Sequence, residues 1–159
     1  MKGLRSGKKW LVLGGAALAL AATPMAVVAA SSQGGSGLDQ QNFVLTTTSA
    51  STSSTAWANV PGLRDHAVCA RDGVSATVSL VLTGAPADVR VRLNDATTVK
   101  PGSVRFDPGS GTTGFSFTFV QPVSNGIQSF DVQWRSPTGG AVTLARGDLN
   151  VLFEDGTCG

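Results

Sequence analysis

The stretch V-S-A-T-V-S-L-V-L, residues 74–82, carries an apolar side chain at every second position. Successive side chains of a β-strand point to opposite faces, so this spacing turns one face toward a core and leaves the serine and threonine hydroxyls on the other. The stretch therefore predicts a half-buried β-strand.

The same alternation recurs along the chain, in residues 89–93, 115–119, 130–134 and 149–153. Glycine, proline, asparagine and aspartate separate these segments at roughly the 8–12-residue spacing that is typical of sandwiches and barrels. After residue 30, no segment of ordinary helix length has a helical period. We predict an all-β protein, a single antiparallel β-sandwich of jelly-roll-like type, with an immunoglobulin-like sandwich as the alternative.

The first thirty residues have the composition of a secretion signal. A basic start without acidic residues is followed by an apolar run, and small residues precede the junction, as in a cleavable signal peptide. We predict that residues 1–30 are a signal peptide cleaved after Ala30. An uncleaved membrane anchor is the alternative, although many alanines and a proline suit it poorly. Residues 31–42, polar and glycine-rich, predict a flexible leader, and residues 43–159 form the predicted sandwich domain.

The positive charge of the chain belongs to this signal. Removing it takes away four of the 12 basic residues and none of the 10 acidic ones, so the formal net charge changes from +2 to −2. The remaining basic residues are dispersed, which excludes the concentrated positive charge that nucleic-acid binding requires. We expect a secreted protein, extracellular or at the cell surface, or periplasmic in a Gram-negative cell, without stable membrane insertion after cleavage.

Two cysteines, Cys69 and Cys158, remain after cleavage. An even pair in an oxidising compartment predicts a disulfide, with two buried free thiols as the alternative. Closing a loop of about 90 residues would destabilise the unfolded chain by roughly 4 to 5 kcal/mol in the chain-entropy model. Two cysteines and one histidine do not make the clustered ligand set of a zinc site, and we expect no cofactor.

No catalytic constellation can be identified. His66, the only histidine, follows Asp65 in a polar segment, but no Gly-x-Ser-x-Gly elbow presents a serine to it. The nine aspartates and Glu154 offer no pair whose spacing predicts the opposed carboxylates of a glycoside hydrolase. We therefore predict that the protein is not an enzyme.

Other residues give weaker indications of binding. Sugar binding would use aromatic rings as platforms, but only Trp57 and Trp134 remain after cleavage, and Trp134 shares a strand face with Phe130 and is expected in the core. Asn94-Asp95 and Asp107 could supply oxygens to calcium, but acidic turn residues more often make Asx turns.

The tripeptide Arg146-Gly147-Asp148 is one that many extracellular proteins present to integrins. Leu144 and Leu149 flank it closely, which indicates either a tight hairpin tip or a bulge at a strand edge. We favour this structural role and keep receptor binding through these three residues as the alternative.

Several segments resemble a module of uncharacterised exported bacterial proteins and phage-borne surface proteins. The closing strands of that module are similar to G-I-Q-S-F-D-V-Q-W-R, residues 126–135, and to A-V-T-L-A-R, residues 141–146. Residues 56–63 and 99–103 resemble its opening strand and its mid-domain turn. The resemblance implies a jelly-roll sandwich of the tumour-necrosis-factor-like type, which trimerises at the heads of fibres.

Two departures from that pattern matter. Gln128 stands where the module usually has histidine, and Gly147-Asp148 adds a residue ahead of the final strand. The first change puts a trimer contact at this position in doubt, and the second predicts a bulge in the last strand.

We expect a secreted, non-enzymatic β-sandwich that acts as a surface, matrix or adhesion module toward an unknown protein or glycan, with a homotrimer as the assembly that the resemblance implies. The alternative is a carbohydrate-binding or carbohydrate-active protein. That alternative requires an aromatic ring or a close carboxylate pair in a surface groove.

Overall fold

The computed structural model describes residues 39–158 of the chain. The predicted signal peptide, residues 1–30, and residues 31–38 of the predicted leader lie outside this range. The described part contains eight strands, all in one antiparallel sheet, and no helix, which confirms the all-β prediction. The strands are β1 (Asp39–Thr46), β2 (Ala50–Thr52), β3 (Ala58–Gly84), β4 (Ala87–Leu93), β5 (Thr97–Thr98), β6 (Val104–Phe106), β7 (Thr112–Arg135) and β8 (Val142–Asp155).

The start of β1 corrects the predicted domain boundary. The strand begins at Asp39 and pairs with β8, so residues 39–42, which we assigned to the flexible leader, belong to the sheet. Their sequence, D-Q-Q-N, lacks the apolar alternation that marks the other strands. Backbone pairing with β8 orders them instead.

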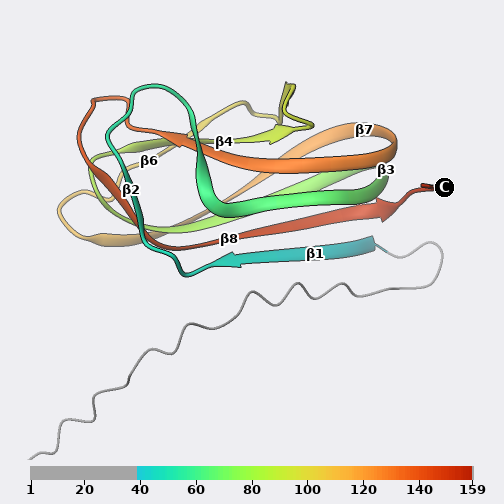
Figure 1. Ribbon diagram of the computed structural model, residues 1–159, viewed down its shortest axis with the longest axis horizontal. Helices are drawn as coiled ribbons and strands as arrows, with labels where there is room; N and C mark the ends of the chain where they lie inside the picture. Colours follow the sequence, from blue (N-terminus) through green and yellow to red (C-terminus); the bar gives the residue numbers. More distant parts are fainter. Residues whose placement is uncertain (1–38, 159) are drawn as a thin grey trace, which may run out of the picture.

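A long ribbon of two strands organises the sheet. β3 and β7 pair along almost their whole lengths, and the ribbon doubles back on itself, at the right of Figure 1. In one arm the second half of β3 lies between β8 and the first half of β7, with β1 outside β8. In the other arm the second half of β7 lies between the first half of β3 and β4. The arms face each other across the core (Figure 1).

Irregular backbone permits the bend. The β3–β7 register shifts between Ala70 and Asp72, and Asp72 has a φ of 59°. Gly126, which pairs with Ala70, has a φ of 150°, a region that glycine enters without a Cβ clash. The buried Gln128 side chain donates hydrogen bonds to the carbonyl oxygens of Ser124 and Gly126, and these bonds hold the backbone of β7 next to the bend.

One core lies between the two arms, and it confirms the predicted alternation. The even-numbered apolar residues from Val74 to Leu82 are all buried, and Trp134 is only 2% exposed. These residues join a single cluster with the inward side chains of β4, β7 and β8. The arrangement is sandwich-like. All eight strands belong to one continuous antiparallel sheet.

The predicted disulfide is present and lies at the bend. Cys69 and Cys158 are bonded, with a Cα–Cα distance of 5.9 Å, and no free cysteine remains in residues 39–158. Next to it, the amide of Gly156 donates a hydrogen bond to the carbonyl of Cys69. The end of the chain is therefore fixed to the point where the ribbon turns. Within the described residues no helix is long and apolar enough to cross a membrane.

Replacing both cysteines, Cys69→Ser with Cys158→Ser, should lower the free energy of unfolding by about 4 to 5 kcal/mol, because the unfolded chain regains the entropy of a long loop. Urea unfolding of the oxidised protein, the reduced protein and the double variant measures the difference. The reduced protein and the double variant should unfold at the same urea concentration. A double variant as stable as the oxidised protein would contradict this account.

Candidate ligand-binding site

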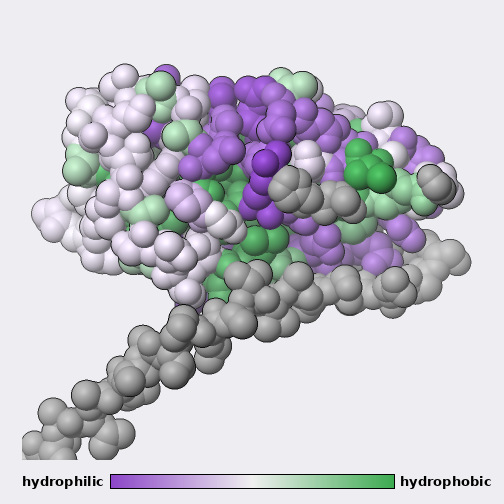
Figure 2. All heavy atoms as spheres, viewed as in Figure 1, coloured by the Kyte–Doolittle hydropathy of each residue, from purple (hydrophilic) through white to green (hydrophobic). Residues whose placement is uncertain are grey.

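The outward side of the arm that contains β4, the second half of β7 and the first half of β3 carries alternating charges. In register across β4 and β7, Asp88 pairs with Arg135, Arg90 with Gln133 and Arg92 with Asp131. These residues point outward because their neighbours along each strand are apolar core residues. We call this surface the arginine face; it includes the outward residues of the first half of β3 and of β6. Figure 2 shows a strongly hydrophilic surface where β4 and β7 lie in Figure 1.

The arginine face is positive in a domain that is otherwise negative. It holds five arginines and three aspartates, namely Arg64, Arg90, Arg92, Arg105, Arg135, Asp88, Asp95 and Asp131. The rest of residues 39–158 carries three basic and seven acidic residues. Charge is thus separated between the sides of the molecule, and this favours approach of an anionic partner to one arm.

Trp57 lies in a shallow depression on this face. The guanidinium carbons of Arg90 and Arg135 are 4.2 Å and 4.7 Å from the centre of its ring. Both contacts are within the range of cation–π attraction. The depression has a volume of about 430 Å³, and the turn at residues 101–103 and Thr98 complete its wall.

A buried carboxylate holds one of the two arginines. Asp88 is 6% exposed and accepts hydrogen bonds from Nε of Arg105 at 2.9 Å and from Nε of Arg135 at 3.1 Å. Burial alone would raise the pKa of Asp88, but the hydrogen bonds and positive charges of Arg105 and Arg135 outweigh it and lower that pKa. Asp88 is therefore ionised at neutral pH, and it fixes the position of Arg135 beside Trp57.

Arg90 is held by a neutral side chain, and no carboxylate of the described residues pairs with its positive charge. Its Nε donates to Oε1 of Gln133 at 2.9 Å, and Nε2 of Gln133 donates to Oδ1 of Asn59 at 2.8 Å. Burial, followed by repulsion from Arg92 and Arg135, lowers the pKa of Arg90, yet an arginine stays protonated at neutral pH. No described residue accepts a hydrogen bond from its terminal amino groups. These donors can bind a carboxylate, sulfate or phosphate group.

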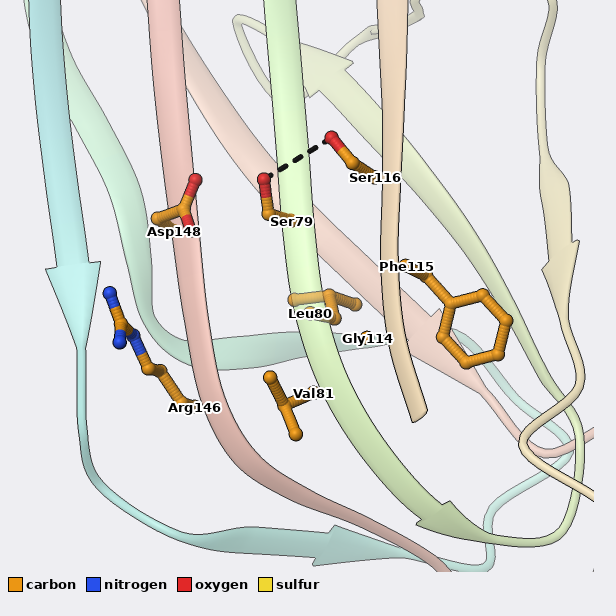
Figure 3. A pocket seen from close by; sticks show the side chains of 8 residues that line it. All are labelled: Ser79, Leu80, Val81, Gly114, Phe115, Ser116, Arg146 and Asp148. Atoms are coloured by element: carbon orange, nitrogen blue, oxygen red, sulfur yellow. Dashed lines mark hydrogen bonds between the residues drawn. The ribbon is translucent and has the colours of Figure 1, made fainter. Parts of the chain in front are cut away.

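The predicted receptor tripeptide lies inside a strand of the other arm, the one that contains β1, β8, the second half of β3 and the first half of β7. Arg146, Gly147 and Asp148 belong to β8, which has β1 on one side and β3 on the other (Figure 3). The register with β3 shifts between Arg146 and Leu144, so β8 has a bulge, but it centres on Ala145 and not on Gly147-Asp148, where we predicted it. The tripeptide does not occupy a projecting loop, which favours the structural interpretation.

Gly147 has a packing role within this tripeptide. It is buried, and a Cβ built on it would lie 2.9 Å from Cδ1 of Leu63 and 2.9 Å from Cδ2 of Leu80. A glycine is needed here because the inner side of the strand touches the core directly. Arg146 and Asp148 remain on the outside, beside a depression of about 280 Å³ that includes Ser79 and Ser116.

The other candidate residues do not assemble into a site. Asp65 is buried and faces Asn42, whereas the side chain of His66 lies outside what the structure describes. Asp107 accepts a hydrogen bond from the amide of Gly109, as an Asx turn requires, and Asn94 accepts one from the amide of Ser129. Among the described residues, no group of three or more histidines, cysteines, aspartates and glutamates could hold a metal ion.

Sequence reasoning did not identify Trp57 or its partners as a site. Arg90 and Arg135 are far from Trp57 in the sequence. They meet it only because β4 pairs with β7 and because Trp57 immediately precedes β3, which also pairs with β7. A local signal did exist, because Arg90 and Arg92 occupy the polar positions of an otherwise apolar strand. Our sequence analysis nevertheless took the arginines to be dispersed, and this was wrong, because the strand pairing brings five of them onto one face.

Comparison with known proteins adds no family: no protein-family profile matches the chain, and no curated protein matches its sequence.

Gly147→Ala should lower the free energy of unfolding by about 1 to 3 kcal/mol, because the added methyl group overpacks the core beside Leu63 and Leu80. The matched control is Ala145→Ser, an exposed change in the same strand, which should stay within about 0.5 kcal/mol of the parent. Urea unfolding compares them. Equal stability of the two variants would show that Gly147 has no packing role.

Asp88→Asn should lower the free energy of unfolding at pH 7 by about 1 to 3 kcal/mol, because two arginines lose a charged acceptor. The folded pKa of Asp88 lies below its ordinary value of 3.8, so the carboxylate stabilises the fold above that pH and ceases to as the pH falls through the folded value. Unfolding measured from pH 7 downward should show parent and variant separated at pH 7 and 5, with a separation that narrows as the pH falls below 3.8. A constant separation would contradict the assignment.

Proposed function

We propose that this protein is an exported, non-enzymatic binding module that takes an anionic glycan at the arginine face. The observation that carries the proposal is the placement of two guanidinium groups against the ring of Trp57 in a surface depression. The disulfide fits an extracellular location, where such modules work.

The chemistry of the depression supports a charged glycan over a neutral one. Neutral sugars stack on an open aromatic ring, but here guanidinium groups already lie against Trp57. The free donors belong to Arg90, and they match the planar geometry of a carboxylate or a sulfate. Trp57 then acts as the support that orients the arginines, while the arginines make the polar contacts.

The shape of the site supports a polymer. The depression is shallow and lies on the face of a sheet, unlike the enclosed, mostly apolar pockets that bury small ligands. Weak contacts repeated along a chain of acidic sugars suit a surface of this kind, because several modules on one polymer reinforce one another. A role in adhesion or in a matrix follows from such binding.

Binding should be seen by titrating the protein recovered after export with polygalacturonate, which carries carboxylates, heparin, which carries sulfates, and neutral dextran. We expect binding to at least one acidic polymer, weakening as salt screens the charges, and none to dextran. Arg90→Gln should weaken binding by about 10- to 100-fold, since one hydrogen-bonded charge contributes about 1.5 to 3 kcal/mol.

Arg71→Gln is the matched control, because Arg71 pairs with Glu154 on the other arm and the change removes the same charge. It should leave the affinity within about twofold. Equal losses from Arg71→Gln and Arg90→Gln would indicate attraction by net charge alone. Absence of binding to both acidic polymers would reject the proposed ligand class.

A further inference from the structure

The outward side of the other arm has a different chemistry. There β1, β8, the second half of β3 and the first half of β7 run side by side (Figure 3). The serines and threonines that alternate with the core residues of β3 and β7 lie on this side, and two pairs are hydrogen-bonded across the strands, Thr77 with Thr118 and Ser79 with Ser116. We call this surface the hydroxyl face.

Large apolar side chains stand among the hydroxyl groups. Val120 is 54% exposed and Leu152 is 42% exposed, and Ser75 pairs with both. On β1, Phe43 and Leu45 are in register with Asn150 and Asp148, so they lie on the same outward side. This face shares one property of interface cores, which is that charged residues are few.

Two opposite charges stand on this face, near the middle of β8. Between Arg146 and Leu152 of β8, and on the strand segments beside them, Arg146 and Asp148 are the only charged side chains directed outward. Neither makes a hydrogen bond or an ion pair with another described residue. They lie about 7 Å apart along the strand, at the rise of an extended chain.

We propose that the hydroxyl face binds the same face of a second copy of this chain around a two-fold axis. Arg146 and Asp148 lie near the middle of β8, which spans Val142–Asp155. When two β8 strands cross in antiparallel sense over this point, Arg146 of each copy meets Asp148 of the other. A two-fold symmetric interface requires such reciprocal contacts: if residue i of one copy contacts residue j of the other, then residue j of the first copy contacts residue i of the second.

The area of the face is sufficient for a specific dimer. Its four strands lie about 4.8 Å apart and rise about 3.3 Å per residue, which gives roughly 700 Å² of sheet per copy. Specific interfaces bury about 500 Å² or more on each partner, with about 800 Å² as the common value. A two-fold axis at Gly147 lets β8, β3 and β7 of the two copies overlap, whereas β1, which pairs only with residues 147–154 of β8, lies on one side of the axis, so the shared area is roughly 500 Å² per copy.

Two charge reversals test the pairing. Arg146→Asp leaves two acids near the middle of β8, and Asp148→Arg leaves two arginines, so each variant alone opposes its own copy. Light scattering on a sizing column, over a range of concentrations, should give twice the chain mass for the parent and a single chain mass for each variant. The dimer dissociation constant should rise by at least about tenfold in each case.

Mixing the two variants provides the decisive observation. The acidic face of one then meets the basic face of the other, and the mass should return to that of a dimer. The control Asp107→Arg makes the same charge change in an exposed turn outside the face, and it should remain dimeric. Leu152→Lys, which places a charge on the apolar part of the face, should dissociate the dimer through a second residue.

A monomeric parent at high concentration would overturn the proposal, as would a trimeric parent, which the fibre-head resemblance implies. Variants that stay dimeric alone, or a mixture that stays monomeric, would also overturn it. Failure of glycan binding at the arginine face leaves this test unaffected, because the two faces lie on different arms.

Discussion

The structure depends on a hydrogen-bonded ribbon, β3 with β7, that bends without losing its partners. A sheet folded over its own core must turn a corner, and every backbone amide and carbonyl at that corner still needs a hydrogen-bond partner. Here Asp72 and Gly126 adopt positive φ, the register shifts, and Gln128 bonds the carbonyl oxygens at the turn. The disulfide holds the end of β8 at the same place. The core exists because this corner brings two arms together.

The bend also explains why one protein has two unlike faces. Each long strand contributes half its length to each arm, so one element carries two separate outward rows. In β3 the row of the second half is Ser75, Thr77 and Ser79, whereas Arg64 lies outward in the first half. In β7 the corresponding rows are hydroxyl-rich before the bend and charged after it. Distinct binding surfaces therefore arise from a single ribbon without separate domains.

The parts of the fold that could be predicted from the sequence are the strands with alternating apolar residues. Residues 74–82 and 130–134 have the period of half-buried strands, and the structure buries their apolar members. The bend carries no such signal, since β3 runs through it as one strand and only Asp72-Gly73 marks the position. The site at Trp57 could not be predicted either, because it is formed by arginines that long-range strand pairing brings beside the ring. Residues 39–42 were missed since an outer strand can be ordered by hydrogen bonds to its neighbour alone.

The position of the disulfide determines how the domain would carry a mechanical load. Tension applied at the C-terminus beyond Cys158 passes through a covalent bond into Cys69, at the corner of the ribbon. It therefore does not peel β8 from β3 and β1 one hydrogen bond at a time, which is the weakest geometry for a terminal strand. A pull on the chain beyond Cys158 reaches the corner of the ribbon before it reaches the hydrogen bonds of β8.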